Sequence, residues 1–312
     1  MAWAFELVHG PLGGPIGGLA WDGSGMLFCD INNSVILRWD PQSNSVIPAR
    51  KYTNRTNGIA FGANGVLYGC QSGSRRIVRF MPDRSATVTA TRLAGRVHNN
   101  PYFLTVDRQE RIWFSDPNHS SLAVGPGPQR FPPLEHQSVL RLSRGPRTDW
   151  HIERMTFDTS APAGVAISPD QKTLYVAESG NQPGGVRELR AYPIEDDGTL
   201  GAHIVLHTFG ADRRGIHRGA EGICVDAEGN IIACAGWRRS GPGPLVYVFS
   251  PAGAVLETHA VPADLPLNCA FGDDRLGSLY VSTAAGHLFR IQSIGRKGYM
   301  PRNLSDIAPT NS

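Results

Sequence analysis

Residues 222–236 read GICVDAEGNIIACAG, two short apolar segments on either side of a polar turn at 226–230. Small and large apolar residues alternate in the segments, which is the period-two pattern of a β-strand. The turn carries Asp and Gly, which favour tight chain reversals. The stretch therefore predicts a β-hairpin, and one acidic residue, Glu221, stands directly before it.

The same hairpin pattern occurs six times along the chain. A third strand-like segment follows each copy, such as LVYVFSPAG from Leu245. The copies begin roughly 40 to 60 residues apart, at Gly18, Gly58, Phe103, Gly164, Gly222 and Cys269. Repeats of this length with about four strands each are typical of propellers. The sequence therefore predicts an all-β, six-bladed β-propeller with four-stranded antiparallel blades.

The two ends of the chain are expected to meet in the last blade. The alternating stretch AFELVH, residues 4–9, is suited to form its outer strand and to leave no long edge exposed. Residues 1–295 are thus predicted to form a single propeller, and 296–312 a polar C-terminal tail. The long segments 118–136 and 211–219 are rich in Gly, Pro or charge and are expected as surface loops, with a lid as one option. The GPGP stretches at 125–128 and 241–244 are interpreted as turns.

Bulk properties narrow the class of partner. The net charge of +3 is spread without a block of like charges, and no apolar run reaches the length of a membrane span. We therefore expect a small-molecule partner, no nucleic acid and no membrane, in a cytoplasmic protein without an export signal; the oligomeric state stays open. The five cysteines lie singly in apolar stretches without metal-binding spacing, so we expect reduced, buried thiols. They are Cys29, Cys70, Cys224, Cys234 and Cys269.

Candidate functional residues follow from propeller geometry. The innermost strand of each blade lines the central channel, so the residues just before these strands form a ring around one mouth. The predicted ring consists of Gly17 and Gly18; Arg55 to Asn57; and residues 99–103, 161–163, 217–221 and 266–268. An outer rim follows the second strands and contains Asp30, Asp116, Glu178 and Trp237. Because acids recur at matching places in three blades, we expect these acids to fix loops by accepting backbone N–H groups.

Glu221 is the first candidate for chemistry at this mouth. A carboxylate among apolar side chains such as Ala163 and Phe103 has a raised pKa and serves as a general acid or base. The structural alternative is a salt bridge from Glu221 to Arg218 or Arg55. The sequence leaves both interpretations open.

Tyr102 and His217 are the further catalytic candidates, because a phenol or an imidazole donates a proton to a carbonyl oxygen. Simple filling of the channel by aromatic side chains is the alternative for Tyr102, and an ordinary loop position is the alternative for the histidines. Polar groups would orient the substrate and aromatic rings would wall it in. The predicted substrate-binding residues are Arg55, Asn57, His98, Asn99, Phe103, Trp237 and Asn268.

The ordered motifs GLAWDGSGMLFCDI, TNGIAF, WFSDP, GVAISPDQKTLYVAES, EGICVDAEGN and LNCAFGDD resemble those of one known family. It is the gluconolactonase, senescence marker protein and luciferin-regenerating enzyme family of six-bladed propellers, and the resemblance runs from about Gly14 to Arg290. The resemblance implies lactonase activity. It also implies a divalent metal held in the channel by Glu, Asn and Asp, with a second Asn nearby.

The positions of those ligands differ in this chain. Gly17 stands where the family has the metal Glu, Ala163 where it has Asn, Tyr102 where it has the second Asn, and Glu221 where it has Asp. A hard divalent ion requires several converging oxygen ligands. We therefore predict a degenerate metal site and no bound metal, although the family implies one.

The leading functional hypothesis is an enzyme that binds a small cyclic carbonyl compound in the channel and acts as a lactone or ester hydrolase. The first alternative is a metal-independent lyase, isomerase or cyclase that uses Glu221 as its acid or base. The second is a non-catalytic small-molecule-binding propeller, because a fold can be inherited without its catalytic activity.

Overall fold

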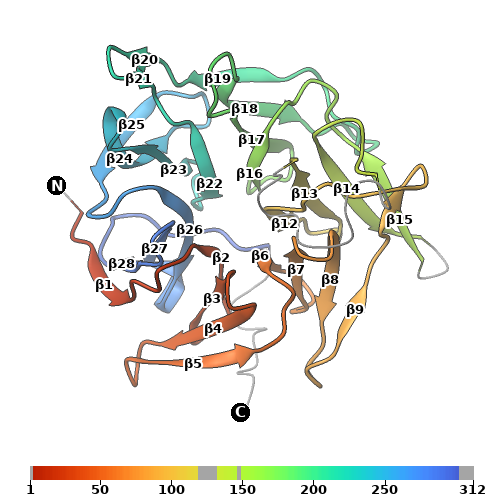
Figure 1. Ribbon diagram of the computed structural model, residues 1–312, viewed down its shortest axis with the longest axis horizontal. Helices are drawn as coiled ribbons and strands as arrows, with labels where there is room; N and C mark the ends of the chain where they lie inside the picture. The colour runs from red at the N-terminus through yellow and green to blue at the C-terminus, as the bar shows by residue number, and fades with distance from the viewer. Residues whose placement is uncertain (1–2, 119–131, 146–148, 302–312) are drawn as a thin grey trace.

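The computed structural model describes residues 3–118, 132–145 and 149–301 of the chain. Six four-stranded antiparallel sheets surround a central axis, as Figure 1 shows. The predicted six-bladed β-propeller is therefore confirmed. In the described parts the one helical element is a 3₁₀ turn, η1 (Asp274–Leu276), and none is long and apolar enough to cross a membrane.

Each blade contributes its first strand to the channel and its fourth to the outside. Blade 1 contains β2 (Ile16–Trp21), β3 (Met26–Asp30), β4 (Val35–Asp40) and β5 (Ser45–Arg50). Blade 2 contains β6 (Thr56–Phe61), β7 (Leu67–Gln71), β8 (Arg76–Phe80) and β9 (Ala86–Val88). Blade 3 contains β12 (Leu104–Val106), β13 (Ile112–Asp116), β14 (Ser138–Arg144) and β15 (Trp150–Arg154). Blade 4 contains β16 (Pro162–Ile167), β17 (Thr173–Ser179), β18 (Arg187–Pro193) and β19 (Ile204–Thr208).

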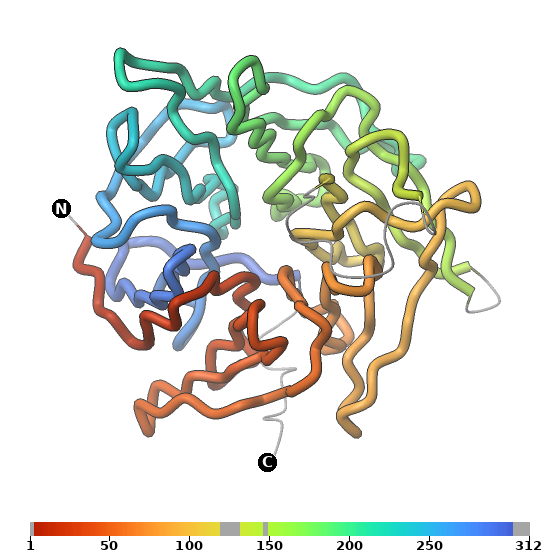
Figure 2. Tube along the Cα trace, viewed as in Figure 1, coloured from red at the N-terminus to blue at the C-terminus, as the bar shows by residue number. Residues whose placement is uncertain are grey.

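Blade 5 contains β22 (Ala220–Val225), β23 (Ile231–Trp237), β24 (Ser240–Phe249) and β25 (Val255–Ala260). Blade 6 contains β26 (Pro266–Gly272), β27 (Ser278–Thr283) and β28 (Leu288–Ile291), and β1 (Glu6–His9) is its fourth strand. Glu6 pairs with Arg290 and Leu7 with Phe289. The predicted closure of the ring by the N-terminal strand is thus confirmed, and Figure 2 shows the red N-terminal segment beside the blue last blade.

The blades pack face to face, which explains their apolar sequences. Every residue of β3, β7 and β13 is buried, whereas β15 alternates between exposed and partly buried positions. Trp39, Trp113 and Tyr280 are at most 2 % exposed. Burial of a large side chain contributes about 2 to 3 kcal/mol. The sheet-to-sheet contacts, rather than a single central core, therefore hold the ring together.

Repeated Asp residues fix the hairpins between first and second strands. Asp22 Oδ1 accepts the N–H groups of Ser24 and Gly25 at 2.9 and 2.7 Å. Asp226 Oδ1 accepts those of Glu228 and Asn230 at 2.9 and 2.8 Å. These bonds satisfy turn N–H groups that the ladder cannot pair.

Several expected loops turn out to be ordered strands or packed segments. Residues 211–219 contain a short hairpin of β20 (Ala211–Asp212) and β21 (Gly215–Ile216), and another joins β10 (Arg92–Leu93) to β11 (Arg96–Val97). The stretch 241–244, predicted as a turn, lies inside β24 instead; Gly241 and Gly243 have positive φ where the pairing with β23 shifts register. The other GPGP stretch, most of the loop 118–136 and residues 302–312 lie outside the described residues.

Candidate functional site

The inner strands β2, β6, β12, β16, β22 and β26 surround the channel, and its two ends differ in chemistry. We call the end at which these strands begin, formed by their first residues and the residues just before them, the polar mouth. The other end is an apolar chamber. Figure 1 looks along this channel.

Three side chains from two blades meet at the polar mouth. The Tyr102 hydroxyl donates to Glu221 Oε1 at 2.7 Å, and Arg218 Nη2 donates to Glu221 Oε2 at 2.7 Å. Ser179 Oγ lies 3.4 Å from the same Oε2. The side chains of Arg218 and Glu221 are 5 % and 9 % exposed. The carboxylate is therefore buried, paired with a cation and bonded to a phenol.

The backbone brings these groups together by letting inner strands approach closely. A Cβ at Gly222, the residue after Glu221, would lie 2.6 Å from the Leu267 carbonyl oxygen. Arg218 Nη1 donates to the Pro266 carbonyl oxygen at 2.9 Å, which ties blade 5 to blade 6. The bulge between Ala220 and Ile223 interrupts the β22–β23 ladder at this point. The local geometry thus turns Glu221 inward.

Tyr102 is held as a neutral hydrogen-bond donor. Burial raises its pKa well above the usual value, and the nearby Glu221 charge and the hydrogen bond to it act in the same direction. The Phe103 ring packs edge to face against the Tyr102 ring, with centroids 4.5 Å apart. The phenol therefore keeps its proton at neutral pH and directs it at the carboxylate.

Asn57 and Gly17 share the space beside Tyr102. The Asn57 side chain partly offsets the rise in the Tyr102 pKa, yet its buried Nδ2 has no hydrogen bond of normal geometry. A Cβ at Gly17 would collide with Asn57 Oδ1. The glycine at the family's metal-Glu position therefore makes room for an amide.

The other predicted residues divide into two groups. Phe103 and Asn268 are buried at the channel, 6 % and 7 % exposed, and Asn268 Oδ1 accepts the Cys269 N–H at 2.9 Å. His98, in contrast, is fully buried, with its ring 5.4 Å from Phe114. Burial lowers the His98 pKa to about 4, so this ring is neutral at pH 7, and its Nε2 lies 3.2 Å from the Ala90 carbonyl oxygen. Asn99 supports the same region, donating Nδ2 to the Asp116 carbonyl oxygen at 2.9 Å.

His217, Trp237 and Arg55 lie farther out. His217 Nε2 is 3.7 Å from Asp212 Oδ2 in the β20–β21 hairpin, and no hydrogen bond or ion pair joins His217 to Glu221 in the described part of the chain. Trp237 Nε1 donates to Ser240 Oγ at 2.6 Å. The Arg55 Nε is buried without a hydrogen-bond partner. The structure thus brings Glu221 together with Tyr102 but not with His217.

The rim acids behave as expected from their recurrence. Asp116 Oδ2 accepts the Asn99 N–H at 2.7 Å, and Glu178 Oε1 accepts the Ser160 N–H at 2.6 Å. Each bond holds the segment that leads into the inner strand of the same blade. Burial raises the pKa of Asp116 to about 8.

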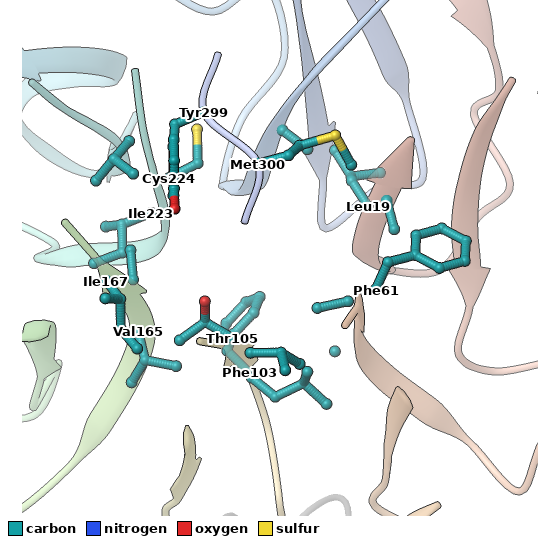
Figure 3. A pocket seen from close by; sticks show the side chains of 18 of the residues that line it. Leu19, Phe61, Phe103, Thr105, Val165, Ile167, Ile223, Cys224, Tyr299 and Met300 are labelled. Atoms are coloured by element: carbon teal, nitrogen blue, oxygen red, sulfur yellow. The ribbon is translucent and has the colours of Figure 1, made fainter. Parts of the chain in front are cut away.

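An apolar chamber occupies the opposite end of the channel. It has a volume of about 170 Å³. Figure 3 shows the side chains of Leu19, Phe103 and Val165 in its wall, together with the thiol of Cys224. The segment 296–300 crosses its mouth. Tyr299 N donates to the Val225 carbonyl oxygen at 3.3 Å, and Gln171 Nε2 donates to the Tyr299 hydroxyl at 3.2 Å. Sequence reasoning did not identify this chamber, because the inner strands read as ordinary core.

The residues present do not fit the divalent cation that the family implies. Gly17 and Ala163 carry no ligating atom, and Glu221 Oε2 is already paired with the Arg218 cation, which would repel a metal ion. Throughout the described parts of the chain, no three His, Cys, Asp or Glu side chains are arranged to hold an ion. The Tyr102–Glu221–Arg218 cluster occupies the place of those ligands.

Arg218 and Ser179 were not predicted as site residues. Arg218 belongs to the predicted ring segment 217–221 and was considered as a possible salt-bridge partner of Glu221, and that ion pair is confirmed. Its spacing, three residues before Glu221, was the available signal. Ser179 ends β17 in another blade, and no pattern in the sequence links it to Glu221.

Comparison with known proteins places the whole ring in one group. A gluconolactonase from Zymomonas mobilis subsp. mobilis is 24 % identical over 288 residues, with 87 % of this chain and 76 % of the relative covered. A gluconolactonase structure from Xanthomonas campestris is 27 % identical with a TM-score of 0.75, covering 93 % and 89 % of the two chains. A calcium-binding regucalcin structure from Agrobacterium tumefaciens shares the fold at 16 % identity, a TM-score of 0.71 and 96 % coverage of both chains. Residues 17–285 match the SMP-30/Gluconolactonase/LRE-like region, so the chain belongs to this family.

Proposed function

We propose that the chain is a lactone hydrolase that opens a small cyclic ester at the polar mouth without a divalent metal. The observation that carries the proposal is the Tyr102–Glu221–Arg218 cluster at the channel axis. A buried carboxylate bonded to a protonated phenol is a pair of groups between which a proton can move over 2.7 Å. The gluconolactonases named above support the substrate class.

Proton transfer through Tyr102 would activate the attacking water. As the water oxygen bonds to the lactone carbonyl carbon, one water proton passes to the Tyr102 oxygen, and the phenolic proton passes to Glu221 Oε1. The transfer avoids a free phenolate, which the raised Tyr102 pKa disfavours. When the tetrahedral intermediate collapses, the ring C–O bond breaks. Glu221 returns its proton through Tyr102 to the leaving alkoxide, which gives a hydroxy acid.

The developing negative charge on the carbonyl oxygen requires a donor at the same mouth. The Asn57 amide is buried beside Tyr102, where its contact with the phenol acts to lower the Tyr102 pKa, so it is the candidate donor. A pre-positioned amide of this kind lowers a barrier by about 3 kcal/mol. Arg218 would keep the carboxylate oriented and its charge balanced.

The test is hydrolysis of a panel of aldonolactones and simple lactones by wild-type protein and by Glu221→Gln. We expect the variant to lose at least 100-fold in kcat, of the order that general-base loss causes, with little change in KM. Glu195→Gln, at an exposed position, is the matched control and should retain the wild-type rate. A Glu221→Gln enzyme with wild-type kcat would refute the role of Glu221.

A metal-independent lyase or isomerase is the second candidate. Two observations favour it. Gly17 and Ala163 lack the side-chain oxygens that the resemblance implies at their positions, and the Tyr102–Glu221 pair can transfer protons to and from a carbon atom as well as an oxygen atom. Reaction in ¹⁸O-labelled water separates the two, since hydrolysis alone incorporates the label. A ligand that raises the melting temperature and returns unchanged would instead indicate a binding protein.

A further inference from the structure

Two cysteines of neighbouring blades are in contact on the channel wall. Cys224 Sγ of β22 lies 3.5 Å from Cys269 Sγ of β26, and both are free thiols. The two strands belong to different sheets and share no ladder. Their close approach follows from Gly222, which lies against the backbone of Leu267 and Asn268.

Cys224 is the most exposed of the five cysteines. Cys29, Cys70 and Cys234 are fully buried, whereas Cys224 is partly exposed and lines the apolar chamber, as Figure 3 shows. Cys269 lines the same chamber but is only 3 % exposed. A small uncharged oxidant entering the chamber therefore meets Cys224 more readily than Cys269.

The two thiols are not equivalent. The hydrogen bond with Cys224 raises the pKa of Cys269 well above its usual value; burial acts in the same direction and a contact with Cys234 acts against it. Cys269 therefore stays protonated, and its sulfur lies within 3.5 Å of both the Cys224 sulfur and the Ile232 carbonyl oxygen. Access to solutes decides which thiol an oxidant reaches first, so Cys224 is the sulfur that an oxidant attacks and Cys269 the one that resolves the product.

We propose that Cys224 and Cys269 are a redox-active pair that hydrogen peroxide converts into a disulfide joining the inner strands of blades 5 and 6. The Cys224 sulfur attacks one peroxide oxygen, the O–O bond breaks, and the products are a sulfenic acid and water. The Cys269 sulfur then attacks the Cys224 sulfur, the S–O bond breaks, and the hydroxyl leaves as water with the Cys269 proton. Two thiols are oxidised and one peroxide is reduced to two waters.

The two sulfurs are already in van der Waals contact, which is the starting point for this bond. The sulfurs must approach from 3.5 Å to about 2.05 Å. The crosslink would close a segment of 45 residues and restrict the unfolded chain, so it should raise the melting temperature. It would stand three residues from Glu221 on β22, yet its formation does not depend on the proposed hydrolase activity.

The experiment treats the reduced full chain with hydrogen peroxide, alkylates the remaining thiols and maps the peptides by mass spectrometry. We expect two of the five thiols to be lost as one Cys224–Cys269 disulfide, reversibly with dithiothreitol, and a higher melting temperature. Cys224→Ser should form no disulfide, and Cys269→Ser should instead accumulate the sulfinic acid of Cys224. Cys70→Ser, at a buried cysteine of β7, is the matched control and should form the same crosslink.

Three results on the wild-type chain would overturn the proposal. They are five unchanged thiols, a sulfinic acid on Cys224 with the other four thiols intact, or a disulfide that includes Cys234. Each of these results is measured on the wild-type protein, so the test does not depend on whether a variant folds.

Discussion

At the residue scale, the Arg218–Glu221 pair is the most demanding interaction of the site. Both side chains are at least nine-tenths buried, so each charge depends on the other for compensation. Removing one member of a buried pair costs about 3 to 5 kcal/mol, because the remaining charge is left unpaired. The pair therefore fixes the geometry of the site, and substitution of either residue is expected to lower the free energy of unfolding strongly.

A double-mutant cycle tests this dependence. We expect Arg218→Ala to lower the free energy of unfolding by about 3 kcal/mol, as measured by urea denaturation. Adding Glu221→Gln to Arg218→Ala should restore part of that loss, since the unpaired charge is gone. Strictly additive effects of the two substitutions would mean that the residues do not interact as the geometry requires.

At the element scale, the ends of the second strands carry the acids that hold the polar mouth. One of them, Asp116 at the end of β13, makes the stability of the protein depend on pH. Its pKa is about 8 in the folded protein, against about 3.9 in an unfolded chain. Between these values the folded state holds a proton that the unfolded state has released. The contribution of Asp116 to the free energy of unfolding is therefore largest below pH 4 and is lost as the pH rises towards 8.

Asp116→Asn should remove this pH dependence. We expect the variant to gain stability relative to wild type as pH rises from 5 to 8, by at most about 1.4 kcal/mol per pH unit. Thermal or urea unfolding across that range measures the difference. Asp196→Asn, at an exposed position, is the control, and a difference between Asp116→Asn and wild type that does not change with pH would contradict the assignment.

The elements also show what sequence can and cannot predict. The six hairpins were predictable because Asp or Gly marks each turn and because small and large apolar residues alternate on both sides of it. Glu221 and Tyr102 were found because they lie where inner strands begin, Glu221 as the second residue of β22 and Tyr102 two residues before β12. The roles of Arg218 and Ser179 were not, since they depend on side-chain directions and on the contact of separate blades. The strand at 241–244 was missed because its glycines serve a register shift that looks like a turn in the sequence.

At the scale of the whole molecule, ring closure depends on the pairing of the chain's two ends. Phe5 packs edge to face on Phe289 at 6.0 Å, and Trp3 stacks on His259 at 3.8 Å. We expect deletion of residues 1–9 to lower the melting temperature by several degrees and to promote aggregation through the exposed edge of β28. Calorimetry and light scattering measure both effects. An unchanged melting temperature would show that β1 contributes nothing to closure.

The ring as a whole has a polar mouth and an apolar chamber on one axis. At the polar mouth a phenol, a carboxylate and a guanidinium from blades 3 and 5 lie together, and the resemblance puts metal ligands of the family at the positions of two of them, Tyr102 and Glu221. The central claim is that these groups carry out the chemistry that the family's cation would otherwise support.

The most direct test is the rate of lactone hydrolysis by wild-type protein before and after exhaustive chelator treatment, with calcium, zinc or manganese added back. We predict the same rate in every sample, with activity lost only in Glu221→Gln. A rate that falls after chelation and returns with one of these metals would contradict the claim, because it would mean that other residues rebuild a metal centre.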